Sequence, residues 1–258
     1  FESRKTALPH MSGVGSGYDQ SPLTLSPEGK VFQTEYAQKA VDNAPSALGI
    51  KCKDGVVLCC EKLIQSKLLV SGSGRRIHAV DRHAGMALTG LTADARMVVN
   101  RARGEASNYI SFYGDRIPGS LLCDRMASYF HVFTLYWYVR PYGVGALMAV
   151  KDAEGPHLYM LETSGEAHRY FGAAIGKGRQ AAKTEIERLK LSEMTVREGA
   201  AALAKIMHQV HDEKDKTFEI EMSWICEESG WEFKRLPEEF LAEVDAAGKA
   251  ALDEDDGL

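Results

Sequence analysis

The sequence predicts an α+β protein built as a four-layer α/β/β/α sandwich, with two antiparallel sheets covered on their outer faces by helices. Three observations support this fold class. The expected strands and helices occur in blocks and do not alternate, which excludes a doubly wound parallel sheet. The dipeptide Asp54-Gly55 separates two β-rich runs, as the short loop of an antiparallel hairpin does. The second run, Val56–Cys60, is apolar throughout, as expected of a strand buried on both faces.

The first predicted element is a helix that follows a tight turn. Ser26–Gly29 has the residues of a type I turn, with Pro27 fixing φ at the second position and glycine at the fourth. Lys30–Val41 then shows one apolar stripe with polar residues on its other faces, as a surface helix packed on its own domain does. The stripe consists of Phe32, Tyr36, Ala37 and Ala40.

The other elements are predicted from β-rich runs, apolar periodicity and turn residues. We expect strands in the hairpin 45–61 and at 68–71, 77–80, 84–88, 144–151, 157–162, 166–171, 218–226 and 231–235. We expect helices at 92–112, 120–139, 178–190 and 195–211, and a last helix from Pro237. Thr92 is predicted to cap its helix, and residues 172–178 are predicted to be a connection from strand to helix.

Composition excludes several functional classes. The net charge of −5 gives no basic surface for nucleic acid or for an anionic membrane. No apolar run reaches the length that crosses a bilayer, and residues 1–10 lack the apolar segment of a secretory signal. The five cysteines show no paired spacing, so we expect all of them to be reduced, in the cytosol or nucleus.

The chain is expected to hold one main domain, residues 18–250, between two tails. Residues 1–17 are predicted to be flexible, and residues 1–10 are either an extension or an addition ahead of Met11. Residues 251–258 form an acidic C-terminal tail. The glycines of residues 13–17 follow no strand, which argues against a dinucleotide-binding loop.

No cofactor or metal site is predicted. Residues 172–178 lack both the spacing and the Ser or Thr of a phosphate-binding loop. His208 and His211 lie three residues apart on a helix, but a zinc site needs a third convergent ligand. The sequence contains no Gly-x-Ser-x-Gly nucleophile motif.

The opening segment resembles a known signature. It contains Tyr18-Asp19, then Ser26–Val31, and then Gln33-x-Glu35-Tyr36-Ala37. This pattern is similar to the N-terminal signature of the alpha-type subunits of the 20S proteasome. Further segments resemble the same family, and two of them point to the eukaryotic member at the seventh position of the alpha ring. These segments are 91–96, 139–143, 174–187 and 210–213.

This resemblance implies the fold of the N-terminal-nucleophile hydrolases. Their chemistry needs a Thr, Ser or Cys at the chain terminus, where the free α-amine acts as the base. Here the first strand begins near Ser46, Pro45 stands close to the place of the nucleophile, and no Gly-Thr cleavage junction precedes it. We therefore expect no catalytic residue in this chain.

The resemblance also implies two sites. Tyr18, Asp19, Pro27 and Tyr36 correspond to a cluster that holds the N-terminal tails when the axial pore opens, with a Tyr hydroxyl bonded to an Asp carboxylate of a neighbouring subunit. Arg76 corresponds to the basic residue of a pocket that receives the C-terminal tails of activators. Many relatives have lysine there, and arginine keeps the charge but changes its geometry.

The partners implied are six other alpha-type subunits in a ring, beta-type subunits below it, and regulatory particles, in the cytoplasm and nucleus. Such a protein would be a scaffold and a gate for substrate entry. Two alternatives remain open at this point. One is a hydrolase activated by an unrecognised processing event, and the other is a free-standing binding protein that uses its acidic tail.

Overall fold

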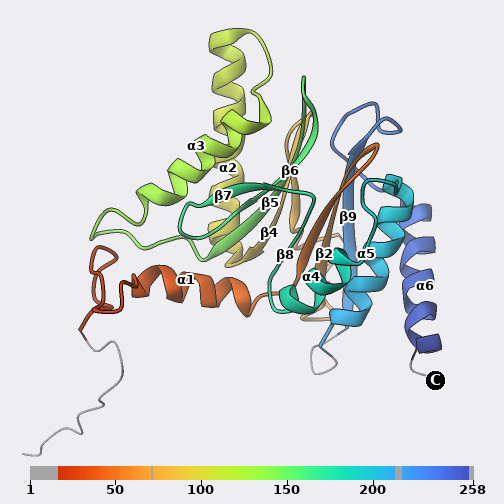
Figure 1. Cartoon of the computed structure of the whole chain (residues 1–258), viewed down its shortest axis with the longest axis horizontal. Coiled ribbons are helices and arrows are strands. Elements are labelled where there is room, and N and C mark those ends of the chain that lie inside the picture. Colours follow the sequence, from red (N-terminus) through yellow and green to blue (C-terminus); the bar gives the residue numbers. More distant parts are fainter. Residues whose placement is uncertain (1–16, 71, 213–216, 256–258) are drawn as a thin grey trace, which may run out of the picture.

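The computed structural model describes residues 17–70, 72–212 and 217–255. The predicted tail of residues 1–17 therefore lies, except for Gly17, outside the described residues. Two antiparallel five-stranded sheets form the centre of the molecule (Figure 1). The first sheet has the order β10-β9-β2-β1-β8. Its strands are β1 (Ala47–Cys52), β2 (Gly55–Leu63), β8 (Gly172–Ile175), β9 (Phe218–Cys226) and β10 (Lys234–Arg235).

The second sheet has the order β3-β4-β5-β6-β7, so each strand pairs with its neighbour in sequence. Its strands are β3 (Ile77–Asp81), β4 (Ala84–Gly90), β5 (Val144–Asp152), β6 (Gly155–Leu161) and β7 (Ala167–Tyr170). The chain crosses from this sheet to the first one at Phe171, between β7 and β8.

Helices cover the outer face of each sheet, as Figure 1 shows. Two of them pack on the second sheet, and three pack on the first. The former are α2 (Thr92–Tyr113) and α3 (Gly119–Val132), and the latter are α4 (Arg179–Glu187), α5 (Val196–Val210) and α6 (Glu238–Asp255). The predicted four-layer α/β/β/α sandwich is therefore confirmed.

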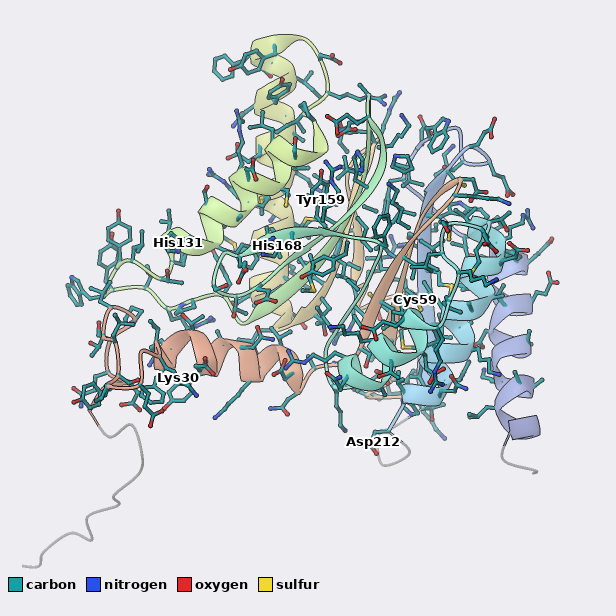
Figure 2. All side chains as sticks on the ribbon, viewed as in Figure 1. Lys30, Cys59, His131, Tyr159, His168 and Asp212 are labelled. Atoms are coloured by element: carbon teal, nitrogen blue, oxygen red, sulfur yellow. The ribbon has the colours of Figure 1, made fainter. Side chains whose placement is uncertain are left out.

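Three apolar clusters correspond to the three interfaces between these layers. Alternate residues of a strand point to opposite faces, and β2 shows this directly. Val57 and Cys59 pack under α4 and α5, whereas Val56 and Leu58 lie between the sheets. Because both faces of β2 are buried, its sequence contains the continuous apolar run Val56–Cys60. Figure 2 labels Cys59 in the first sheet and Tyr159 in the second.

Helix α1 (Phe32–Asp42) lies across one end of the sandwich and packs against β4 and β5 (Figure 1). The turn predicted before it is present, since the Gly29 amide donates to the Ser26 carbonyl at 2.8 Å. Val41 and Ala37 form its buried side. The chain that leaves α1 enters β1, which lies between β2 and the edge strand β8 of the first sheet, and this connection fixes the helix at this end.

Several local predictions were wrong. Residues 68–70 form no strand, because Leu68 and Val70 project into solvent and pair with no neighbouring strand. Helix α3 ends at Val132 and not at residue 139, and residues 133–139 form turns with exposed aromatic side chains. Gly172–Ile175 is a strand, because it pairs with β1 and completes the edge of the first sheet. Thr92 opens α2 but does not cap it.

Candidate functional site

The junction between α1 and β1 occupies the place where the resemblance would put a terminal nucleophile. Here the backbone is continuous and held from several sides. The Lys177 amide donates to the Ala44 carbonyl at 2.9 Å, and the Thr89 hydroxyl donates to the Pro45 carbonyl. Gly178 donates its amide to the Ser46 hydroxyl oxygen at 3.0 Å. These bonds come from separate segments of the chain, so the junction is rigidly placed.

Glu61 is the central group of this junction. Its carboxylate is 4% exposed and accepts the Ser46 amide at 3.0 Å through Oε2. Its other oxygen, Oε1, lies 2.6 Å from Nδ1 of His211 at the end of α5. A buried carboxylate with a bond on each oxygen meets the usual requirement for burying this group.

Ser46 therefore has none of the properties of a nucleophile of this chemical class. Its nitrogen is part of a peptide bond, and that N–H is donated to Glu61. Its side chain is 2% exposed, and its oxygen accepts the Gly178 amide. The hydroxyl has neither an amine base nor access for a substrate.

The predicted gating residues lie at the outer end of α1. The Tyr36 hydroxyl donates to Oδ2 of Asp19 at 3.3 Å, and the Gln33 side-chain amide donates to the Asp19 carbonyl. The Tyr–Asp bond that we expected between neighbouring subunits thus occurs within this chain. Figure 2 labels Lys30, which marks the turn just before the helix.

Desolvation and the neighbouring Asp19 carboxylate raise the pKa of Tyr36, so its hydroxyl keeps its proton and donates it. Tyr18 is 40% exposed, and Tyr36 is 41% exposed. Pro27 lies in the turn between them, nine residues from each along the chain. The structure joins Asp19 to Tyr36 and leaves the ring of Tyr18 on the surface.

Two of the other segments that resemble the family, 91–96 and 139–143, meet at Asp94. Arg140 donates to both carboxylate oxygens of Asp94, at 2.7 and 2.9 Å, and the Gly143 amide donates to Oδ2 at 3.0 Å. Burial alone would raise the pKa of Asp94, but the hydrogen bonds from Arg140 and Gly143 outweigh it and hold that pKa below its usual range. This pair connects α2 to the segment that leads into β5.

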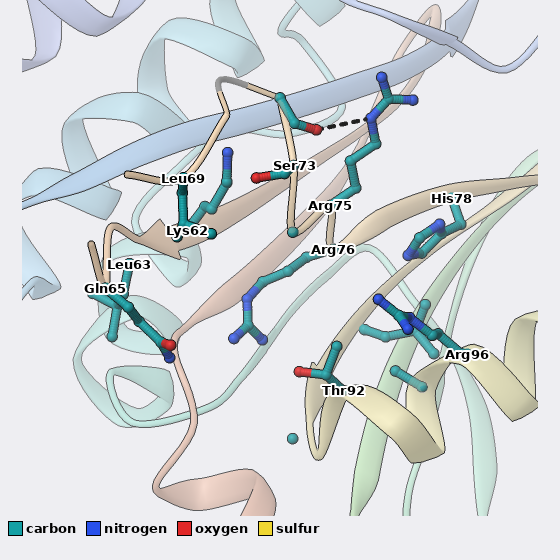
Figure 3. Close-up of a pocket in the computed structure, with 15 residues that line it drawn as sticks. Lys62, Leu63, Gln65, Leu69, Ser73, Arg75, Arg76, His78, Thr92 and Arg96 are labelled. Carbon is teal, nitrogen blue, oxygen red and sulfur yellow. Dashed lines mark hydrogen bonds between the residues drawn. The ribbon is translucent and has the colours of Figure 1, made fainter. Parts of the chain in front are cut away.

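Arg76 lines a cavity of about 460 Å³ between the end of β2, the start of β3 and the first turns of α2 (Figure 3). Its backbone is held on both sides. The Arg76 amide donates to Oε2 of Glu221 at 2.8 Å, and the Arg76 carbonyl accepts the Leu88 amide at 3.0 Å. The side chain is half-buried.

The cavity holds cationic residues that sequence reasoning missed. Lys62, Arg75 and Arg96 line it together with Arg76, and its lining contains no Asp or Glu. The adjacent arginines at 75 and 76 could have indicated a basic site. Arg96 could not have been assigned to it, because a helix 20 residues further along the chain brings it there.

No group of three His, Cys, Asp or Glu side chains suited to a metal ion occurs within residues 17–70, 72–212 and 217–255. His208 pairs with Asp245 at 2.8 Å, and His211 pairs with Glu61, so the two histidines diverge. All five cysteines are free thiols in buried positions, as predicted. Among the helices of the described part, none is long and apolar enough for a transmembrane span.

Comparison with known proteins agrees with this geometry. Residues 18–40 match the N-terminal signature of A-type proteasome subunits, and residues 41–225 match the general model of proteasome subunits. The boundary between the two matches falls at the last turn of α1, just before the junction with β1.

Several curated proteins are similar over nearly the whole chain. The alpha type-3 proteasome subunit of Spinacia oleracea is 61% identical over 247 residues, which cover 95% of this chain and 99% of that protein. Alpha type-3 of Dictyostelium discoideum is 50% identical, over 95% of this chain and 99% of that protein. The probable alpha type-7 proteasome subunit of Schizosaccharomyces pombe is 45% identical, over 94% and 96% of the two chains. With the A-type signature on helix α1 and the family match over both sheets, the chain belongs to the family of proteasome subunits, and within it to the alpha-type members.

Proposed function

We propose that this chain is a non-catalytic alpha-ring subunit of the 20S proteasome core particle, which builds the wall of the particle and controls substrate entry. The observation that carries this proposal is the uninterrupted backbone at Ser46, whose amide is bonded to the buried Glu61 carboxylate. A threonine-type peptidase needs a free amine at this place. The proposed partners are six other alpha-type subunits, beta-type subunits below them and regulatory particles, in the cytoplasm and nucleus.

Within this role, we propose a cluster that holds the N-terminal tails when the pore opens. It consists of Tyr18, Asp19, Pro27 and Tyr36. The bond between Tyr36 and Asp19 supports this assignment, because it shows that the two side chains can pair. Arg76 is proposed to receive the terminal carboxylate of an activator tail. Its place in a cationic cavity without carboxylates supports that assignment.

The experiment that tests the function combines assembly with active-site labelling. Native mass spectrometry of the purified particle should find this chain uncut at Ser46 and present beside other alpha-type and beta-type subunits. A threonine-directed covalent inhibitor should label beta-type subunits and leave this chain at its unmodified mass. An adduct on this chain, or a new N-terminus at a Thr, Ser or Cys, would instead establish the processed hydrolase.

A second experiment addresses the gating cluster. Tyr36→Phe removes the hydroxyl that reaches Asp19 and keeps the ring that packs beside Phe32. Particles with this variant should hydrolyse a short peptide more slowly in the presence of an activator. Inhibitor labelling of the beta-type subunits should stay unchanged, because only passage through the pore is affected. Equal stimulated rates in the variant and the wild type would remove Tyr36 from the gate.

A further inference from the structure

We infer that the cavity beside Arg76 binds two negative charges of one peptide, the terminal carboxylate at Arg76 and an acidic side chain from the last two residues at Arg96. The inference rests on the proposed role of Arg76 and goes beyond it, because it names a second contact and a preference in sequence. It makes this chain select acidic C-termini among the tails that dock on the particle.

The first argument is the concentration of unbalanced charge. The whole chain has a net charge of −5, yet the lining of this cavity contains only cations among its formally charged residues. The lining cations are Lys62, Arg75, Arg76 and Arg96. A cavity with a single sign of charge attracts ligands of the opposite sign.

The second argument is which of these cations are already used. Lys62 is paired with Glu219 at 2.9 Å, and Arg75 donates its Nε to the Gly72 carbonyl at 3.3 Å. The guanidinium groups of Arg76 and Arg96 make no ion pair or hydrogen bond to other residues of the described ranges. The terminal nitrogens of Arg75 are also unbonded within these ranges, but its side chain points away from Arg76 in Figure 3. Arg76 and Arg96 are therefore the forked donors that we assign to the ligand, and each matches the two oxygens of a carboxylate.

The third argument is that the two arginines reach one cavity from different elements. Arg76 precedes β3, whereas Arg96 is on the second turn of α2, and both are drawn in the cavity of Figure 3. Thr92, the first residue of α2, lies between them in that view, and the N-terminal end of a helix adds partial positive charge. A ligand that reaches both arginines spans the cavity.

The lining also accounts for the peptide character of the ligand. Leu63 and Leu69 add apolar side chains to the lining. A small inorganic anion would leave this surface in water, whereas the carbon atoms of a peptide's last side chains would cover it. The lining thus fits an extended C-terminus with an acidic residue.

Glu221 fixes the backbone at Arg76. Its Oε2 accepts the amides of Arg76 and Ile77, at 2.8 and 3.4 Å. This carboxylate reaches across from β9 in the first sheet to β3 in the second, but it is not part of the cavity lining. The Arg76 backbone is therefore fixed while its guanidinium stays available.

The test uses assembled particles and photo-crosslinking peptides of eight residues. The peptides carry Glu or Gln at the last or the next-to-last position, each as the free acid and as the C-terminal amide. Crosslinks are mapped by mass spectrometry, so that crosslinks to the other alpha-type subunits serve as an internal control. The wild-type chain should capture the Glu peptides about fivefold more than the Gln peptides, the effect of one partly exposed charge pair.

Three variants assign the contacts. Arg96→Gln should abolish the preference for Glu over Gln and keep the preference for the free acid over the amide. Arg76→Gln should abolish the preference for the free acid over the amide and keep the preference for Glu over Gln. Arg96→Lys should retain part of the preference for Glu, since it keeps the charge but not the fork. The matched control is Arg103→Gln, two turns further along the same face of α2 and outside the cavity, which should change neither ratio.

The outcomes separate the two proposals. A wild-type chain that prefers the free acid but captures Glu and Gln peptides equally overturns the second contact and leaves the role of Arg76 intact. A preference for Glu that survives Arg96→Gln overturns the assignment of Arg96. A wild-type chain indifferent to both the terminus and the side chain overturns both proposals.

Discussion

Asp94 shows how one side chain can connect two distant segments of the sequence. It lies in the first turn of α2, where an acidic residue would ordinarily favour the positive end of the helix dipole. In the structure it is 7% exposed and binds Arg140 and the Gly143 amide. The residue type was predictable as a helix-start residue, but its partner was not, because 46 residues separate the two side chains.

We predict that Asp94→Asn destabilises the full-length chain by about 2 kcal/mol, below the usual cost of breaking a buried pair because the Arg140 side chain is 59% exposed. The pKa of Asp94 is lowered on folding, so its contribution is present above its ordinary value of 3.8 and is lost as the pH falls through the folded value. Urea unfolding at pH 7 and at decreasing pH should show the difference between variant and wild type becoming smaller.

Glu228→Gln is the matched control, because it breaks a carboxylate–arginine pair on the surface. Glu228 and Arg197 are both exposed, and solvent screens their attraction. The control should therefore change stability less than Asp94→Asn at pH 7. An equal effect of the two variants would show that the Asp94 pair contributes no more than a surface contact.

At the scale of the element, strand β8 and the turn after it contact the segment that connects α1 to β1. Gly176 follows β8 with φ +99°, and a Cβ there would lie 2.7 Å from the Pro45 carbonyl oxygen and 2.8 Å from Cα of Ser46. Glycine is required both for the left-handed conformation and for this close approach. Sequence patterns described this stretch only as a connection, because pairing with β1 is a long-range contact.

We predict that Gly176→Ala destabilises the chain by about 3 kcal/mol, since it adds a steric clash to the cost of a positive φ. Gly155→Ala is the control. Gly155 has φ +125°, but its added Cβ would meet nothing within 4 Å. In thermal unfolding, the free energy of unfolding of the Gly155 variant should be about 2 kcal/mol higher than that of the Gly176 variant. Similar losses in both would mean that the junction yields to the extra methyl group.

Helix α5 begins with a side-chain cap. Thr195 accepts the Glu198 amide at 3.3 Å, and the Thr195 amide donates to the Glu198 carboxylate at 2.8 Å, so a capping box is formed. We predict that Thr195→Ala costs about 1 kcal/mol in the free energy of unfolding. Thr184→Ala, inside α4, removes a hydroxyl that bonds only to the Gln180 carbonyl and should be neutral or stabilising. Denaturation of both variants by urea is the measurement.

Helix ends were harder to predict than helix starts. α3 ends at Val132, although aromatic residues continue the apolar pattern to Tyr138. The Phe133 and Thr134 amides bond to carbonyls three residues earlier, which tightens the last turn and ends the helix. The composition of residues 133–139 favoured a longer helix, whereas the position of β5 requires the chain to return to the sheet.

At the scale of the whole molecule, the sandwich has two unlike ends. α1 and its junction close one end through Glu61, Ser46 and the packing against β4 and β5. The layers themselves follow from burial, because each sheet has apolar side chains on both faces and each helix has one apolar stripe.

We predict that charge reversal at Glu61 affects assembly more than it affects the chemistry of the particle. Glu61→Lys removes the acceptor of the Ser46 amide and places a cation beside His211. Native mass spectrometry should show fewer complete particles, because a buried group is left without its partner. Inhibitor labelling per assembled beta-type subunit should stay at the wild-type level.

Glu219→Lys, an exposed residue on the neighbouring strand β9, is the control and should assemble normally. A wild-type yield of complete particles from Glu61→Lys would show that the junction tolerates the loss of its central carboxylate.

The sequence by itself determined the fold class, most strand and helix positions, the family and the missing nucleophile, since these follow from local periodicity, turn residues and contiguous motifs. Only the tertiary structure decided the pairing of β8 with β1, the bond of Glu61 to Ser46, the pairing of Asp94 with Arg140 and the presence of Arg76 and Arg96 in one cavity. Each of these joins residues far apart in the chain. Their contact energies depend on positions set by packing, which no local pattern contains.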